Sequence, residues 1–177
     1  FDLDKVKNGS VVVRAAKPGE KIITLDGVER ELNNEELVIA DEERPIAIAG
    51  IIGGVESEIT AETKNIFLEV AYFEPSNIRK TARRLGIITE SSYRNERGMD
   101  IEGIEEASER AVALIAEIAG GEVLDGAIDR YIEKPKKCEI PLSFEKLNKF
   151  VGKELPEDVV GKILSNLGFG IKTLSQD

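Results

Sequence analysis

Four short runs rich in β-branched residues lie between Ser10 and Gly50, and they constrain the fold more than any other feature. Runs of this length between turn residues are typical of β-strands. Asp26-Gly27 follows the second run and predicts a hairpin with a type I′ turn, which needs positive φ at both central residues. This part of the chain is therefore predicted to be rich in strands. The runs are Val11–Ala16, Lys21–Leu25, Glu36–Ala40 and Pro45–Ala49.

The most apolar strand-like run is Ile66–Phe73, and one acid, Glu69, interrupts it. Because side chains alternate along a strand, Glu69 is predicted to share a face with Phe67, Ala71 and Phe73. Burying an unpartnered carboxylate costs several kcal/mol. Two interpretations follow. Either this is an edge strand with Glu69 in water, or Glu69 lies in an aromatic slot and accepts a ligand hydroxyl.

Two helices are predicted after this run. Pro75 suits a first helical turn, so a basic helix is expected from Ser76 to Leu85 with Gly86 closing it. A second is expected over Ile101–Ala119, and Glu122–Ile132 is expected to return as one or two strands. The apolar stripe of the second helix predicts packing against the core. Its members are Ile104, Ala107, Ala111, Leu114, Ile115 and Ile118.

The pattern changes at Pro135-Lys136-Lys137, which is typical of a linker. Beyond it we expect a strand over Glu139–Leu142, a helix capped by Ser143 and running to about Val151, and a helix from Pro156 to near Leu167-Gly168. We predict a first domain over residues 1–134 and the start of a small helical domain over 135–177.

The fold class expected is α+β, with a β-rich, barrel-like core and a layer of helices, followed by a small helical fragment. The chain opens on Phe1-Asp2-Leu3-Asp4 without an initiator methionine. We therefore expect it to be a piece of a longer protein.

The composition excludes several kinds of chemistry within these residues. There is no histidine and only one cysteine, which removes Ser-His-Asp and Cys-His catalysis and the usual zinc sites. No metal site is expected. No apolar run approaches the roughly 20 residues of a membrane span, and no leader opens the chain. The sequence predicts a cytoplasmic protein without membrane contact.

Charge is unevenly distributed. The chain carries 24 Lys and Arg against 34 Asp and Glu, a net charge of −10, which argues against coating nucleic acid with its whole surface. Between Ser76 and Asn95, however, five basic residues face one acidic residue. They form either a solvated helix face or a patch that contacts RNA phosphates. The five are Arg79, Lys80, Arg83, Arg84 and Arg94.

Two further segments are candidates for a site. Gly50, Gly53 and Gly54 form a glycine-rich turn that can bring backbone N–H groups close to a ligand oxygen, although a tight bend explains it equally well. The segment Thr89–Asp100 is dense in hydroxyls and charges. A polar loop with helix caps explains much of that segment.

The motifs resemble the editing module of the bacterial phenylalanyl-tRNA synthetase β subunit over residues 1 to about 132. Residues 139–177, with Leu164–Phe169, resemble the start of the helical module that follows it. The matching motifs are Phe1–Asp4, Leu25–Gly27, Ala40-Asp41, Ala49–Gly54 with Ser57, Leu68–Phe73, Arg83–Gly86, Thr89–Arg94 and Glu96–Asp100.

This resemblance implies hydrolysis of tyrosine mistakenly esterified to the phenylalanine tRNA. It implies that Glu69 accepts the tyrosine hydroxyl, with Ser91 in the substrate pocket beside Phe67 and Ala71 of the predicted strand face. The catalytic positions implied are Thr89, Gly50 and Gly53. A water would attack the ester, and the free hydroxyl of the terminal adenosine is a candidate assistant. The alternative is a tRNA-binding or subunit-packing module without a competent hydrolytic site.

The resemblance also implies partners. They are the acceptor end of tRNA(Phe) and the α subunit, in an assembly of two α and two β subunits. ATP and Mg²⁺ are implied for the whole enzyme, and no cofactor is expected in this fragment. The family has a histidine two positions before the residue matched by Phe1 and a threonine-asparagine pair further upstream, so the pocket is expected to be incomplete here. Asn95 stands where the family often has an aromatic residue.

Overall fold

The structure is a computed structural model that describes residues 1–131 and 138–172. The chain forms two compact units, Phe1–Asp125 and Gly126–Asp177, and each is described by itself. The boundary predicted at residues 134 and 135 falls outside the described residues and stays a prediction. Within the described ranges, no helix has the length and apolar character needed to cross a membrane.

The first unit contains an antiparallel sheet in the order β1-β4-β5-β6. The register pairs Val13 with Ile39, Ile39 with Ala47 and Ala47 with Gly53, and a bulge lies at Ile39/Ala40. Three of the four predicted runs form strands of this sheet, and the two central ones are almost fully buried. The strands are β1 (Val12–Ala15), β4 (Leu37–Ala40), β5 (Pro45–Ile48) and β6 (Ile52–Gly53).

The predicted hairpin forms between β2 (Lys21–Ile23) and β3 (Glu29–Glu31), but its turn is not type I′. Only Gly27 has positive φ, at 77°, and its N–H donates to the Thr24 carbonyl at 2.8 Å. The Asp26 carboxylate accepts from the Thr24 hydroxyl at 2.6 Å and from Arg30 at 2.8 Å. These bonds hold Asp26 in a longer connection, where positive φ is needed at one residue only.

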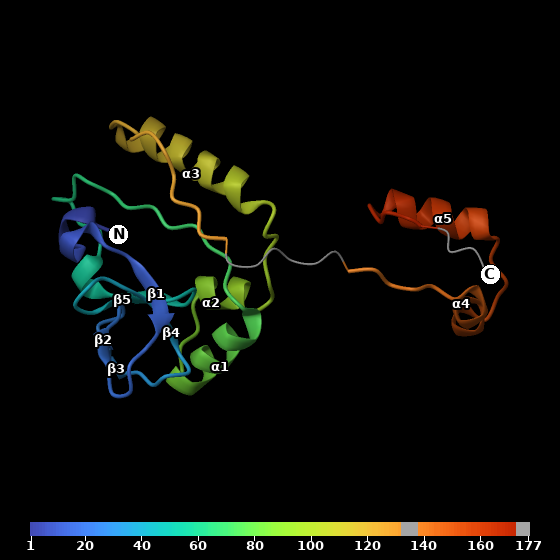
Figure 1. Ribbon diagram of the computed structural model, residues 1–177, viewed down its shortest axis with the longest axis horizontal. Helices are drawn as coiled ribbons and strands as arrows, with labels where there is room; N and C mark the ends of the chain where they lie inside the picture. Colours follow the sequence, from blue (N-terminus) through green and yellow to red (C-terminus); the bar gives the residue numbers. More distant parts are fainter. Residues whose placement is uncertain (132–137, 173–177) are drawn as a thin grey trace. The chain divides into compact units, whose positions relative to one another are not determined.

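The α+β class is confirmed, but no closed barrel is present in the described residues. β1 and β6 are the two edges of the open four-stranded sheet, and the hairpin is a separate sheet joined to it by a single bridge between Thr24 and Gly54. Figure 1 shows this arrangement, with α1 and α2 beside the sheet.

The long strand predicted over Ile66–Phe73 does not form. Asp2 and Ile66 make one isolated bridge, and Phe1 and Phe67 exchange two backbone hydrogen bonds of 2.9 Å. From Leu68 to Phe73 the segment contains no strand, because among the described residues only Phe1 and Asp2 pair with the run, at Phe67 and Ile66. Phe73 is the one side chain of the run that is buried in the core, and Ala71 is partly buried against it.

Two other predicted strands are also absent from the described residues. Glu122–Tyr131 and Glu139–Leu142 are exposed and contain no strand, and Ile132 lies outside the described part of the chain. Three short 3-10 helices were not predicted. They are Leu3–Lys5, Lys7–Gly9 and Val55–Ser57.

Helix α1 (Pro75–Leu85) forms as predicted, with Pro75 in its first turn and Gly86 closing it at φ 65°. Its buried side chains, including Ile78 and Ala82, join the core formed by the sheet. Helix α2 (Glu90–Asn95) stands where a polar loop was predicted. A capping box between Thr89 and Ser92 stabilises it, because each residue's side chain accepts from the other's backbone N–H.

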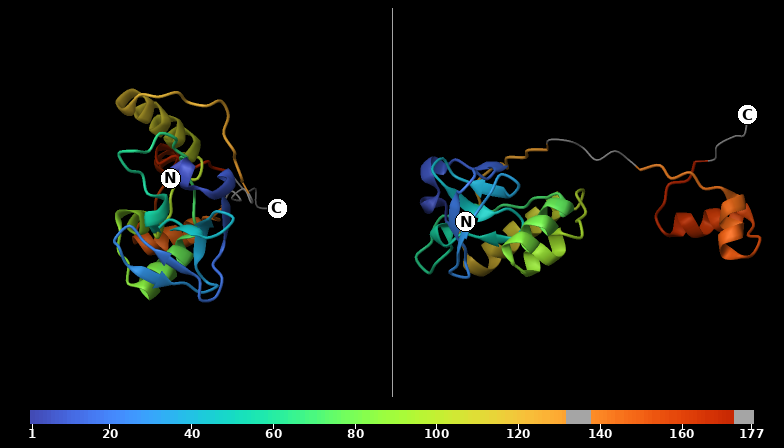
Figure 2. Two further views of the ribbon diagram at one scale, coloured as in Figure 1. Left: turned by 90° about the vertical axis from the view of Figure 1, so that its left-hand side faces the viewer. Right: turned by 90° about the horizontal axis from the view of Figure 1, so that it is seen from below.

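Helix α3 (Ile104–Ala119) begins three residues later than predicted and does not pack into the core. None of its residues is buried, and Ile118 is 80% exposed. Figures 1 and 2 show α3 apart from the sheet, with the segment that leads to Glu69 between them. Three residues of the predicted apolar stripe, Leu114, Ile115 and Ile118, lie against that segment instead of the core.

The second unit contains the two predicted helices, α4 (Phe144–Val151) and α5 (Glu157–Asn166). The Ser143 hydroxyl caps α4 by accepting from the Lys146 N–H at 3.4 Å. Val160 is the one buried apolar side chain among the described residues of this unit, and Phe150 is 92% exposed. A unit with so little core is stabilised weakly by its own contacts.

Candidate functional site

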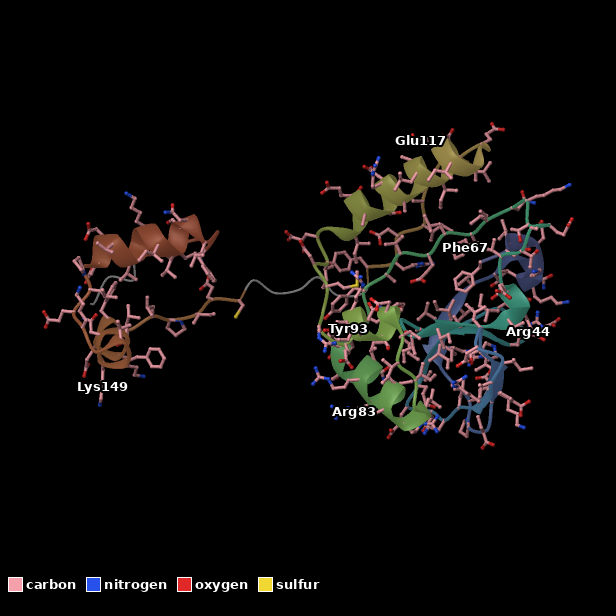
Figure 3. The ribbon with its side chains drawn as sticks, turned by 180° about the vertical axis from the view of Figure 1, so that it is seen from behind. Arg44, Phe67, Arg83, Tyr93, Glu117 and Lys149 are labelled. Carbon is pink, nitrogen blue, oxygen red and sulfur yellow. The ribbon has the colours of Figure 1, made fainter. Side chains whose placement is uncertain are left out.

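An apolar groove of about 520 Å³ lies between the segment Ile59–Glu69 and helix α3. Phe1 and Phe67 form an aromatic pair in it, with ring centroids 6.3 Å apart and planes inclined by 33°. Figure 3 shows Phe67 on the segment that runs below α3. The lining residues are Phe1, Ile59, Ile66, Phe67, Leu68 and Glu69, with Leu114, Ile115, Ile118 and Ala119 from α3.

Among the described residues, Glu69 is the one charged side chain that lines this groove, and it is partly buried. Burial raises the pKa of its carboxyl group. No described residue donates a hydrogen bond to the carboxylate. The groove therefore has an aromatic wall and, in Glu69, a carboxylate that accepts no hydrogen bond from a described residue.

The second cluster lies where α2 meets the glycine turn. The Thr89 hydroxyl donates to the Ile51 carbonyl at 2.7 Å, and the Ser91 hydroxyl donates to the Gly50 carbonyl at 2.9 Å. The Asn95 amide donates to the same Gly50 carbonyl at 3.1 Å. Three side chains from one short helix and its cap thus bind two consecutive carbonyls of the turn.

Close contacts require glycine at positions 50 and 54 of this turn. A Cβ on Gly50, whose φ is 66°, would lie 2.6 Å from Cδ2 of Phe73 and 2.9 Å from Cδ1 of Ile78. A Cβ on Gly54 would lie 2.8 Å from the Ile46 carbonyl oxygen. At Gly53 the nearest atom is Cδ1 of Leu25, at 3.2 Å. The turn is therefore packed against the sheet and α1.

The predicted site residues thus divide between two places. Glu69 and Phe67 line the groove, whereas Thr89, Ser91, Gly50 and Gly53 do not. Thr89, Ser91 and Gly50 are joined by the contacts between α2 and the turn. Ala71 packs against the core instead of lining the groove.

Sequence reasoning missed part of both clusters. The α3 residues Leu114, Ile115 and Ile118 line the groove, although the apolar stripe predicted that they would pack in the core. Asn95 stood out only as a departure from the resembled family. Its position four residues after Ser91 was the available signal, because side chains with that spacing meet on a helix, and its amide also lies 3.2 Å from the Ser91 hydroxyl.

Three of the five basic residues in the predicted patch already contact other groups of this chain. Arg84 forms an ion pair with Glu36, which is 1% exposed, and donates to the Glu31 carbonyl at 3.1 Å. Arg94 lies 3.5 Å from Glu90 on the surface, and Arg79 donates to the Glu96 carbonyl at 3.2 Å.

The other two basic residues, Lys80 and Arg83, form no salt bridge with described residues. Both are exposed. Arg83 and Lys80 are therefore the residues of the patch most available to an external phosphate.

Comparison with known proteins gives a consistent result. The family model described as "B3/4 domain" matches residues 1–120. The phenylalanine–tRNA ligase beta subunit of Fusobacterium nucleatum is 61% identical over 176 residues, which is 99% of this chain and 22% of that protein. The corresponding subunit of Aquifex aeolicus is 51% identical over 167 residues, or 94% of this chain and 21% of that protein.

A third relative, the phenylalanine–tRNA ligase beta subunit of Geobacter metallireducens, is 44% identical over 177 residues and is covered to 22% of its length. The chain thus spans about a fifth of the length of the curated relatives it matches. The family model covers more than half of the chain and includes the groove, the glycine turn and all three helices of the first unit. The chain belongs to the B3/4 domain family.

Proposed function

We propose that this chain is part of a phenylalanine–tRNA ligase β subunit and that its first unit removes tyrosine wrongly attached to tRNA(Phe). One observation carries the proposal. Glu69, a partly buried carboxylate with a raised pKa, lines an apolar groove beside the Phe1–Phe67 pair. In this proposal the carboxylate accepts the hydroxyl of a tyrosyl side chain bound in the groove.

The selectivity follows from the cost of leaving the carboxylate unpaired. A site built to bind a hydroxyl rejects the analogue that lacks it by as much as roughly 10⁴ to 10⁵. Phenylalanine would fit the groove but leave Glu69 desolvated and without a donor, so correctly charged tRNA would escape hydrolysis. Glu69 then acts as a selector and not as a general base.

The hydrolytic step is proposed to use a water that attacks the ester carbonyl, with the free hydroxyl of the terminal adenosine as a candidate assistant. Catalytic roles for Thr89, Gly50 and Gly53 stay predictions. The contacts of Thr89 support a positioning role, because its only hydroxyl hydrogen is donated to the Ile51 carbonyl. Thr89 would thereby hold α2 over the glycine turn.

The remaining features of the whole enzyme are proposals as well. They comprise the α subunit as partner, an assembly of two α and two β subunits, and recognition of the acceptor end of tRNA(Phe). ATP and Mg²⁺ are proposed to act outside this chain. The cytoplasmic location and the relation of residues 139–177 to a following helical module stay predictions.

The alternative is a tRNA-binding or subunit-packing module without hydrolytic activity. The separation of Thr89 and the glycine turn from the residues that line the groove favours this alternative. The two functions differ in what Glu69 does to hydrolysis, so one experiment decides between them.

Deacylation of Tyr-tRNA(Phe) and Phe-tRNA(Phe) should be measured with the full-length β subunit assembled with its α subunit. We expect Glu69→Ala to lower kcat/KM for Tyr-tRNA by roughly 10- to 150-fold, the value of a hydrogen bond to a charged group. Glu62→Ala, at an exposed position of the same segment, is the matched control and should leave the rate unchanged. Equal rates for wild type and Glu69→Ala would reject the editing proposal and leave the binding or packing module.

A further inference from the structure

An aromatic side chain and a guanidinium group are stacked on the surface of the first unit. The Cζ atom of Arg97 lies 3.5 Å from the ring centroid of Tyr93. Arg97 also donates, through one nitrogen (Nη1), to the Tyr93 carbonyl at 2.6 Å and to the Glu96 carboxylate at 2.7 Å, and these bonds hold the guanidinium over the ring. Tyr93 nevertheless remains 53% exposed. Arg97 therefore covers one face of the ring, and the exposed part of Tyr93 is available to a ligand.

Basic side chains of α1 adjoin this stack. Arg79 donates to the Glu96 carbonyl at 3.2 Å, which places it beside the residue that precedes Arg97. Arg83 follows Arg79 by one helical turn and is exposed. Figure 3 shows Tyr93 and Arg83 along the same outer side of the first unit. The stack and the basic row of α1 thus form one surface, which we call the α1–α2 surface.

This surface differs in charge from the rest of the chain. Residues 75–97 contain six Lys and Arg against two Glu, whereas the whole chain has a net charge of −10. An anionic polymer is therefore attracted to this surface and repelled by most of the remainder. A phosphate alone would be satisfied by the basic residues. The exposed tyrosine beside these residues suits a ligand that also carries a flat base.

We propose that the α1–α2 surface binds an unpaired RNA nucleotide, with the base stacked on Tyr93 and the flanking phosphates on the arginines of α1. This deepens the proposed function, on which it rests for RNA as the ligand class. Arg97 covers one face of the ring as a cation, and the exposed Arg83 supplies charge for the backbone. Binding is tolerant of sequence, because every base has a π-face.

Binding of a short labelled oligoadenylate should be measured with the 177-residue chain. We expect Tyr93→Ala to weaken binding roughly 5-fold or more, as is typical for loss of one base-stacking contact. Tyr93→Phe keeps the ring and should restore binding. Tyr131→Ala, at another exposed tyrosine, is the matched control and should bind like wild type. Wild-type affinity in Tyr93→Ala, or an equal loss in Tyr131→Ala, would overturn the proposal.

The phosphate contacts are tested by salt dependence. Removing one contact to a single strand lowers the slope of log K against log salt by about 0.7. We expect this change for Arg83→Ala and not for Arg110→Ala, which removes an exposed arginine of α3. Equal slopes in the two variants would contradict phosphate binding by α1.

A direct readout is possible because the chain contains no tryptophan. Tyr93→Trp introduces a single fluorophore at the proposed stacking position. Oligoadenylate should quench its emission with saturation, and an abasic oligomer of equal length should not. Tyr131→Trp should show no saturable quenching. Equal quenching by both oligomers, or quenching only at position 131, would contradict base stacking even if Tyr93→Ala proved unstable.

These measurements separate the two proposals. Loss of the Glu69 effect on deacylation with retained Tyr93-dependent RNA binding would reject editing alone. Retained Glu69-dependent deacylation without Tyr93-dependent binding would reject the RNA-binding surface alone.

Discussion

Replacing Gly50 with alanine should destabilise the first unit by about 3 kcal/mol, the combined effect of backbone strain and overpacking. The new Cβ would lie 2.6 Å from Phe73 and 2.9 Å from Ile78, both buried in the core. The φ of 66° adds strain that glycine does not have. Relief would require the turn to shift, which would lengthen the bonds from Ser91 and Asn95 to the Gly50 carbonyl. Urea unfolding followed by circular dichroism measures the change.

Gly19→Ala is the matched control. Gly19 has a φ of 76°, and a Cβ added there would meet no atom within 4 Å, so this variant has the strain without the clash. We expect it to cost about 1 kcal/mol. The difference between the two variants reports the packing of the turn. Equal losses at both positions would show that the turn is not held against Phe73 and Ile78.

Replacing Arg84 with alanine should destabilise the same unit by roughly 2 to 4 kcal/mol, because it leaves a buried carboxylate without its charged partner. Glu36 is 1% exposed, and the Asn33 N–H, at 2.5 Å, is its other donor. The partial exposure of Arg84 places the expected loss below that of a fully buried pair. The same unfolding measurement gives the value.

Arg83→Ala is the control for this variant, since Arg83 is the adjacent exposed arginine of α1. It should change the free energy of unfolding by less than about 0.5 kcal/mol. Glu36→Gln removes the carboxylate that Arg84 pairs with. Arg84→Ala should therefore lower the free energy of unfolding less in the Glu36→Gln variant than in the wild type. Additive losses would show that the two side chains do not interact.

Local patterns predicted the elements whose signals lie within a few residues. The β-branched runs gave β1, β2, β4 and β5, and Pro75 with Gly86 gave both ends of α1. The Asp26-Gly27 pair predicted the hairpin but not its turn type. The turn type depended on Arg30, whose guanidinium binds the Asp26 carboxylate four residues away. Short helix α2 was missed because its capping box, and not an apolar stripe, defines it.

Partners distant in sequence decided the remainder. An apolar run such as Ile66–Phe73 becomes a strand only where another strand pairs with it, and within the described part of the chain only Phe1 and Asp2 do so. The helical period of α3 correctly gave an apolar face, but periodicity does not tell what covers that face. The segment that covers this face of α3 carries Glu69. The groove therefore lies between the apolar run and the apolar face of α3, which had been interpreted separately.

Glu69 could be singled out from the sequence, but the α3 residues that line the groove with it, and the separation into two clusters, could not. Glu69 stood out because a charge interrupts an apolar run, and the structure places it in an apolar groove with a raised pKa. The glycine turn and Thr89 stood out through composition, and the structure joins them to each other through α2. No local pattern could show that these are two separate clusters.

The raised pKa of Glu69 has a defined effect on stability. The folded chain binds this proton more tightly than the unfolded chain, whose value is near 4.5. Glu69 therefore costs stability at neutral pH, and the cost disappears as the pH falls through the raised pKa. Glu69→Gln removes the charge and should be more stable than wild type at neutral pH, with the difference vanishing in acid. Urea unfolding of both chains at neutral and acidic pH measures this difference.

The central claim is that the Glu69 carboxylate is held partly desolvated in the apolar groove. The most direct test is a pH titration of its side-chain carboxyl carbon by ¹³C NMR, with Glu69→Gln to assign the resonance. We predict a midpoint above 4.5, the ordinary value of a glutamate carboxyl group. A midpoint at or below 4.5 would contradict desolvation and remove the basis for selection of a hydroxyl.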